Sequence, residues 1–116
     1  MDFIKLNGQN TPSPTLTVGG ISVFKEFLPP SDQLHLVKEL RAVAAQAPVF
    51  SPKTKSGKPM SVRLTAAGDF GWFSDQRGYR YVEQHPSGVN WPEIPDAIMA
   101  IWRAVAGAVP APECCL

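Results

Sequence analysis

Proline is the residue that most constrains the fold of this chain. Twelve prolines and nine glycines are spread over 116 residues. Proline fixes φ and removes a backbone hydrogen-bond donor, so it interrupts helices and the interior of sheets. We therefore expect short elements joined by ordered turns. Hydrophobic residues make up 44% and charged residues 18% of the chain, a composition typical of a folded domain rather than a disordered one.

The N-terminal region predicts a leader followed by a strand. Residues 7–19 are polar, aperiodic and rich in proline and threonine, so we expect little structure there and a flexible leader over residues 1–19. The apolar run over residues 21–28 predicts a first strand, which Pro29 and Pro30 would end.

Apolar residues at helical spacing predict two amphipathic helices. The first is expected over residues 32–46, with Ser31 as its N-cap and Pro48 as its stop. The second is expected over residues 95–106, with Gly107 near its end. The side chains that this second helix is expected to bury are Ile98, Ile101, Trp102 and Val105.

The middle of the chain changes to a period of two. Residues 60–65 alternate apolar and polar side chains, which predicts a strand. A hairpin-like loop over residues 53–58 leads into it, with Gly57 able to take positive φ. Residues 74–78 predict a turn, and residues 79–82 a return strand in which Tyr79 and Tyr81 share a face.

The last residues, 108–116, pass from a proline-broken linker into what we expect to be the start of an apolar strand, so we predict an N-terminal fragment. Cys114 and Cys115 are adjacent and form no disulfide framework, which favours reduced thiols. No secretory signal precedes Gly8, and no run of about 20 apolar residues is present. We expect a cytoplasmic monomer with no membrane contact.

Few residues in the chain could carry out catalysis. His35 and His85 lie far apart and neither belongs to a His-x-Asp or His-x-x-x-His pair, so the pattern predicts no metal site. His35 is interpreted as a helix surface or boundary residue and His85 as a loop residue. Cys114 as a nucleophile would need an activating base, and none is evident. No catalytic residue is predicted within this chain.

A basic segment and a group of aromatic residues are better candidates for binding. Residues 40–68 contain five basic side chains and no acidic one. Such a loop suits a phosphate backbone, although a solvated loop that keeps a strand edge soluble explains the same charges. Five aromatic residues follow within twelve positions. Phe70 and Phe73 are assigned to the core; Trp72, Tyr79 and Tyr81 suit a core or a wet site equally. We expect Trp91 to pack a proline turn and Trp102 to line a helix core face.

A series of spaced landmarks resembles the AlkB-type dioxygenases, over residues 20–116. They are Met60-Ser61-Val62, Gly68-x-x-Gly71-Trp72, Gly78-Tyr79-Arg80-Tyr81, Trp91-Pro92-x-x-Pro95 and Ala111-Pro112-x-Cys114-x-Leu116. The resemblance implies an α+β fold, with a small antiparallel β-sheet lid and two amphipathic helices. This would be the N-terminal portion of a jelly-roll (double-stranded β-helix) dioxygenase whose catalytic barrel is missing.

The resemblance also implies a function and a site. Proteins of this family are DNA repair oxidoreductases that use Fe(II) and 2-oxoglutarate to oxidise N-alkyl groups on bases such as 1-methyladenine and 3-methylcytosine, releasing formaldehyde. Trp72 would stack on the damaged base of single- or double-stranded DNA, or of RNA. Tyr79, Arg80 and Tyr81 would contact the nucleotide and its phosphates, and Met60, Leu64 and Lys58 would border the pocket.

Two departures from the family pattern are visible. The family has an aromatic residue near the position of Lys58. The Asn-x-Tyr strand, the His-x-Asp…His iron triad and the arginines that bind 2-oxoglutarate do not occur in this chain, so we expect the chain alone to be inactive. Two other readings stay open: a non-enzymatic module that binds single-stranded nucleic acid, and a dioxygenase acting on a protein or small molecule.

Overall fold

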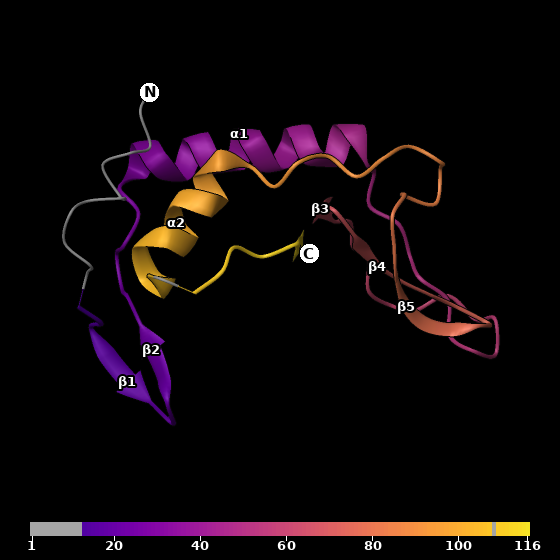
Figure 1. Ribbon diagram of the computed structural model, residues 1–116, viewed down its shortest axis with the longest axis horizontal. Helices are drawn as coiled ribbons and strands as arrows, with labels where there is room; N and C mark the ends of the chain where they lie inside the picture. Colours follow the sequence, from indigo (N-terminus) through magenta and orange to yellow (C-terminus); the bar gives the residue numbers. More distant parts are fainter. Residues whose placement is uncertain (1–12, 108) are drawn as a thin grey trace. The chain divides into compact units, whose positions relative to one another are not determined.

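The structure is a computed structural model that describes residues 13–107 and 109–116 (Figure 1). Over these residues the elements follow the order β1, β2, α1, β3, β4, β5, α2, β6. The strands pair as three two-stranded antiparallel sheets, β1 with β2, β3 with β6 and β4 with β5. The chain divides into two compact units, Met1–Lys38 with Asp96–Ala111 and Glu39–Pro95 with Pro112–Leu116. The predicted α+β composition is confirmed.

The first sheet revises the N-terminal predictions. β1 (Leu16–Val18) pairs with β2 (Ile21–Val23), so the expectation of little structure over residues 7–19 is wrong at its end, while residues 1–12 lie outside the described residues. The predicted strand over residues 21–28 is also too long. It ends at Val23, and Glu26 in the following turn has φ of 52°, a left-handed conformation that an extended strand does not contain.

Helix α1 (Pro30–Gln46) confirms the first predicted helix and begins two residues before it. Ser31 therefore lies inside the helix and is not its N-cap. The carbonyl of Pro29 accepts hydrogen bonds from the N–H groups of Asp32 and Gln33, both at 3.0 Å. Proline is well suited to the first helical position because its missing N–H has no helical partner there.

Helix α2 (Asp96–Ala106) confirms the second predicted helix to within a residue, but its buried face differs from the prediction. The buried residues are Ala97, Ala100 and Ala104, which recur on one stripe of the helix. Ala97 and Ala100 form a small core with Leu28, Leu36 and Ile101. The larger side chains that were expected to be buried, Ile98, Ile101, Trp102 and Val105, are all half-buried.

The second unit contains the other two sheets. β3 (Ala67–Gly68) pairs with β6 (Cys114–Cys115), so the expected strand at the cysteines is present. β4 (Gly71–Asp75) pairs with β5 (Gly78–Val82). The strand predicted over residues 60–65 is wrong: only Leu64 forms an isolated bridge, with Phe50. Residues 61–63 are exposed rather than packed against a sheet.

The core of this unit surrounds Trp91, which was expected only to pack a proline turn. Its indole is 6% exposed and packs with Ala47 and Ala66, with Phe50, Val82 and Cys114 around them. The indole N–H donates a 2.9 Å hydrogen bond to the carbonyl of Val82 in β5. Trp91 therefore fixes the β4–β5 hairpin to the core. No helix in the described part of the chain is long and apolar enough to cross a membrane.

Candidate functional site

The β4–β5 hairpin carries most of the predicted site residues. Its strands are joined by Gln76 and Arg77, within the turn predicted over residues 74–78. Gly78 follows with φ of 98°, which is typical of a type I turn closed by a glycine bulge. In the register of the two strands, Trp72 lies opposite Tyr81 and Phe73 lies opposite Arg80.

One face of the hairpin presents three aromatic rings. Opposed residues in a ladder share a face, and so do residues two apart along a strand. Trp72, Tyr79 and Tyr81 therefore lie together, as predicted for the two tyrosines. The rings of Trp72 and Tyr79 are 5.5 Å apart between centroids. Tyr79 is 73% exposed, Tyr81 is 62% exposed and Trp72 is half-buried. We call these three residues the aromatic face.

The opposite face of the hairpin is directed to the core and holds Arg80. The ring of Phe73 lies 6.1 Å from that of Phe50, in line with its predicted core position. The guanidinium of Arg80 lies 5.1 Å from the Phe73 centroid and donates two hydrogen bonds to Asp75, at 2.7 and 3.0 Å. Alternation thus separates Arg80 from the tyrosines with which it was grouped in the sequence.

The ion pair changes the titration of Asp75. Its hydrogen bonds with the Arg80 side chain and the Arg77 backbone N–H lower the pKa of the carboxyl from 3.8 to about 2. A depressed pKa in the folded state stabilises the fold above the unfolded pKa, and this contribution disappears as pH falls through the folded pKa. The stabilisation is therefore complete above about pH 4 and is lost toward pH 2.

We expect Arg80→Ala to raise the pKa of Asp75 toward 3.8, because it removes the largest cause of the shift. An NMR titration of the carboxyl carbon measures this directly. Asp75→Asn should make unfolding less sensitive to pH between about 4 and 2. If Asp75 titrates identically in the wild type and in Arg80→Ala, the ion pair is not formed in solution.

The basic loop over residues 53–58 is an ordered hairpin, as predicted. The N–H of Thr54 donates to the carbonyl of Lys58 at 2.9 Å, and Gly57 has the expected positive φ, 86°. The loop is also fixed to β4: the N–H of Lys53 donates to the Ser74 carbonyl at 2.9 Å, and the Ser74 hydroxyl donates to the Lys53 carbonyl at 2.7 Å. This loop therefore lies beside the β4–β5 hairpin.

The remaining predicted residues have different surroundings. Lys58 is exposed at the end of the basic loop. Met60 and Leu64 are half-buried, and hydrogen bonds tie their backbones to Pro52 and Phe50 rather than to the hairpin. The structure thus brings Trp72, Tyr79 and Tyr81 onto one face with the loop of Lys58 beside their hairpin, whereas Arg80 lies on the other face.

Sequence reasoning missed a concave region at the tip of the hairpin. A pocket of about 330 Å³ is lined by Lys53, Gly57, Asp75, Gln76 and Arg77. Residues 75–77 had been interpreted only as a turn. The one sequence signal that could have indicated this pocket is Arg77 in a turn, together with a lysine-rich loop elsewhere in the chain. The loop and the turn are brought together by the Lys53–Ser74 hydrogen bonds, which the sequence does not reveal.

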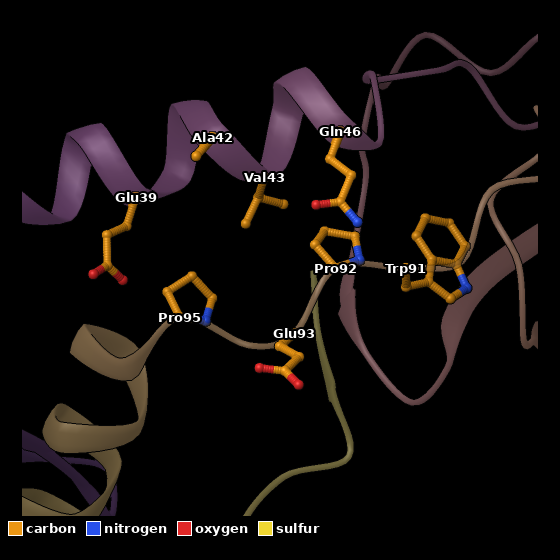
Figure 2. Close-up of a pocket in the computed structure, with 8 residues that line it drawn as sticks. All are labelled: Glu39, Ala42, Val43, Gln46, Trp91, Pro92, Glu93 and Pro95. Carbon is orange, nitrogen blue, oxygen red and sulfur yellow. The ribbon is translucent and has the colours of Figure 1, made fainter.

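A second pocket in the same unit has a different character (Figure 2). It has a volume of about 470 Å³ and lies between the last part of α1 and the segment that follows Trp91. Five apolar side chains, one amide and two carboxylates line it, from Glu39, Ala42, Val43, Gln46, Trp91, Pro92, Glu93 and Pro95. None of the predicted substrate-binding residues lines this pocket.

Comparison with known proteins now identifies the family. Residues 20–116 match the family model of the 2OG-Fe(II) oxygenase superfamily, and the chain belongs to this superfamily. An alpha-ketoglutarate-dependent dioxygenase AlkB homolog of Caulobacter vibrioides is 43% identical over 104 residues, which are 89% of this chain and 47% of that protein. The dioxygenase AlkB of Escherichia coli is 30% identical over 80 residues, 68% of this chain and 37% of that protein. The AlkB-type resemblance is confirmed. The chain spans about half the length of the Caulobacter relative.

The superfamily name specifies Fe(II) and 2-oxoglutarate, but the described residues do not fit an iron site. Over residues 13–107 and 109–116, no group of three or more His, Cys, Asp or Glu side chains could hold a metal ion. His85 is buried with both ring nitrogens in hydrogen bonds, to Pro48 and Ser87. Burial also raises the pKa of the Cys114 and Cys115 thiols, which disfavours the thiolates that bind metals or act as nucleophiles.

Proposed function

We propose that this chain is the nucleotide-recognition part of an AlkB-type dioxygenase that removes N-alkyl groups from nucleic-acid bases. The observation that carries the proposal is the aromatic face of Trp72, Tyr79 and Tyr81, beside the basic loop over residues 53–58. Exposed rings beside cations are the arrangement that holds a nucleic-acid strand by its bases and its phosphates together. Fe(II) and 2-oxoglutarate chemistry would be supplied by residues outside those described.

The chemistry of alkylated bases fits this face. A base such as 1-methyladenine carries a positive charge, so an indole face attracts it by cation–π interaction in addition to stacking. This adds about 0.5 to 2 kcal/mol over a neutral base. Taking a base out of its stack costs a few kcal/mol, and less when alkylation has already weakened its pairing. An open aromatic face can therefore select damaged bases without reading their edges.

The half-buried Trp72 is better placed for this role than a core tryptophan. Its ring lies against Tyr79 at 5.5 Å, which limits its motion, while the exposure of both tyrosines leaves their side of the hairpin accessible to a ligand. In contrast, the indole of Trp91 is enclosed by the core. We assign Trp72 as the main stacking residue, with Tyr79 and Tyr81 extending the surface for the neighbouring nucleotide.

We expect Trp72→Ala to weaken binding of a single-stranded oligonucleotide containing one 1-methyladenine by about 1 to 3 kcal/mol, or roughly 5- to 150-fold in Kd, because the stacking surface is lost. Fluorescence anisotropy with a labelled oligonucleotide measures the change. Trp72→Phe should give an intermediate loss, since a smaller ring remains.

Trp102→Phe serves as the matched control, because it removes an indole from α2 rather than from the aromatic face. Circular dichroism of each variant checks that the fold is retained. The proposal fails if the wild-type chain binds the 1-methyladenine oligonucleotide no more tightly than the unmodified one. It also fails if Trp72→Ala, correctly folded, leaves both affinities unchanged.

A further inference from the structure

The pocket at the hairpin tip has a positive electrostatic balance. Of its lining residues, Lys53 and Arg77 are exposed cations and Asp75 is the one acid. The charge of Asp75 is matched by Arg80, whose guanidinium donates to both carboxylate oxygens. Lys55 and Lys58 are exposed on the same loop. The lining thus presents two cations that have no matching acid within the pocket, which suits an anion.

The backbones of Lys53 and Arg77, and not their cationic side chains, make the hydrogen bonds that hold the pocket together. The N–H and carbonyl of Lys53 are both bonded to Ser74, and the N–H of Arg77 donates to Asp75 at 2.9 Å. Gly57 allows close approach: a Cβ built there would lie 2.9 Å from the Gln76 amide nitrogen. The charged ends of Lys53 and Arg77 can therefore be removed without disturbing these hydrogen bonds.

The pocket and the aromatic face belong to one hairpin. Asp75 follows Trp72 by three positions on β4, which at about 3.3 Å per residue is roughly 10 Å along the strand. A Cβ at Gly78 would lie 3.3 Å from Cε of Lys55, so this lysine side chain lies against the first residue of β5. One bound strand can thus reach both the rings and the pocket.

We propose that the pocket lined by Lys53, Gly57, Gln76 and Arg77 binds a backbone phosphate of the same nucleic-acid strand whose alkylated base stacks on Trp72. This inference rests on the proposed function. The two cations neutralise the phosphate, and the amide of Gln76 donates a hydrogen bond to a phosphate oxygen. Such a contact fixes the register of the strand without reading its sequence.

The test uses the variant Lys53→Ala with Arg77→Ala in the full chain. Its binding is compared over a salt series for an oligonucleotide with one 1-methyladenine and for the unmodified sequence. Because the two cations together neutralise one phosphate, their loss should reduce the slope of log K against log salt by about 0.7, the value for one neutralised phosphate on a single strand. Both oligonucleotides should lose the same factor in affinity, so the preference for the methylated base is retained.

Lys25→Ala with Arg103→Ala is the matched control, because it makes the same change of net charge with exposed residues of the other unit. Its salt slope should equal that of the wild type. A second probe replaces single phosphates beside the lesion by uncharged methylphosphonates. One replacement should weaken binding to the wild type and have no effect on the Lys53→Ala, Arg77→Ala chain.

The outcomes separate the two proposals. An unchanged salt slope in the double variant, with methyl-base preference retained, overturns the phosphate pocket and leaves the proposed function intact. An equal slope loss in the Lys25→Ala, Arg103→Ala control also overturns it, because the effect is then one of net charge. Absence of methyl-base preference in the wild-type chain instead contradicts the proposed function itself.

Discussion

Gly71→Ala is expected to lower the free energy of unfolding by about 3 kcal/mol, the upper part of the range for overpacked cores. A methyl group at this position would overlap Cε2 and Cζ2 of Trp91. The indole cannot move aside freely, because its N–H is bonded to the Val82 carbonyl and its ring is enclosed by the core. Urea denaturation followed by tryptophan fluorescence measures the loss.

Gly88→Ala provides a control of the opposite kind. Gly88 has φ of 94°, but no atom lies within 4 Å of a Cβ built there. Its substitution therefore introduces backbone strain alone, about 1 to 2 kcal/mol, whereas Gly71 has no positive φ and suffers the overlap alone. If Gly88→Ala destabilises the chain as much as Gly71→Ala, close packing of Trp91 on β4 is not the reason that glycine is needed.

Gly71→Ala should also affect ligand binding, because Gly71 is the first residue of β4, the strand that carries Trp72. Gly71 pairs with Val82, and the next pair is Trp72 with Tyr81. Displacing the strand at this point would shift the indole relative to both tyrosines. We therefore expect Gly71→Ala to weaken binding of the 1-methyladenine oligonucleotide even at low temperature, where the chain remains folded.

Elements specified by local pattern were predicted well from the sequence. The repeat of apolar residues every three or four positions located both helices to within about two residues, because helical hydrogen bonds join residues close in the chain. The turn and the second strand of the β4–β5 hairpin were predicted for a similar reason, whereas no strand was predicted over residues 71–75. Its strands are joined through Gln76 and Arg77, so register follows from the turn. This is why the shared face of Tyr79 and Tyr81 was predicted correctly.

Elements that depend on partners far away in the sequence were not predicted well. Residues 60–65 have the alternation of a strand, yet only Leu64 finds a partner, at Phe50. Alternation states which side chains could face a core but not whether a neighbouring strand exists. Arg80 shows the related difficulty for a binding site. It lies between two exposed tyrosines in the sequence, but strand alternation directs it to Asp75 and Phe73.

His85 is the clearest case of a residue whose role the sequence concealed. It was interpreted as a loop residue, which is correct for the backbone, but the side chain is 6% exposed. The centroid of the His85 ring lies 5.3 Å from that of Phe50 and 5.4 Å from that of Trp91, and both pairs are edge-to-face. Its partner Pro48 is 37 positions away in the sequence. No local pattern can predict a hydrogen bond over such a separation.

His85→Ala is expected to lower the free energy of unfolding by about 3 to 5 kcal/mol, as for other buried rings replaced by alanine. Packing and hydrogen bonding both contribute. The Ser87 N–H donates to Nδ1 at 3.0 Å, so Nδ1 is the acceptor and Nε2–H donates to the Pro48 carbonyl at 2.7 Å. Removing the ring leaves a cavity between two aromatic residues and deprives these backbone groups of their partners. The loss is a large share of the total stability of a domain of this size.

Two further substitutions at position 85 separate packing from hydrogen bonding. His85→Phe keeps the ring but removes the hydrogen-bond partner of the Pro48 carbonyl and of the Ser87 N–H. Both residues are exposed, so water can replace the imidazole, and each lost hydrogen bond costs about 0.5 to 1.5 kcal/mol. His85→Gln keeps a side-chain N–H that can reach the Pro48 carbonyl but removes the ring between Phe50 and Trp91. Both should be less stable than the wild type and more stable than His85→Ala in urea denaturation. Should His85→Phe match the wild type, the hydrogen bonds of the imidazole contribute nothing net, and its position is explained by packing alone.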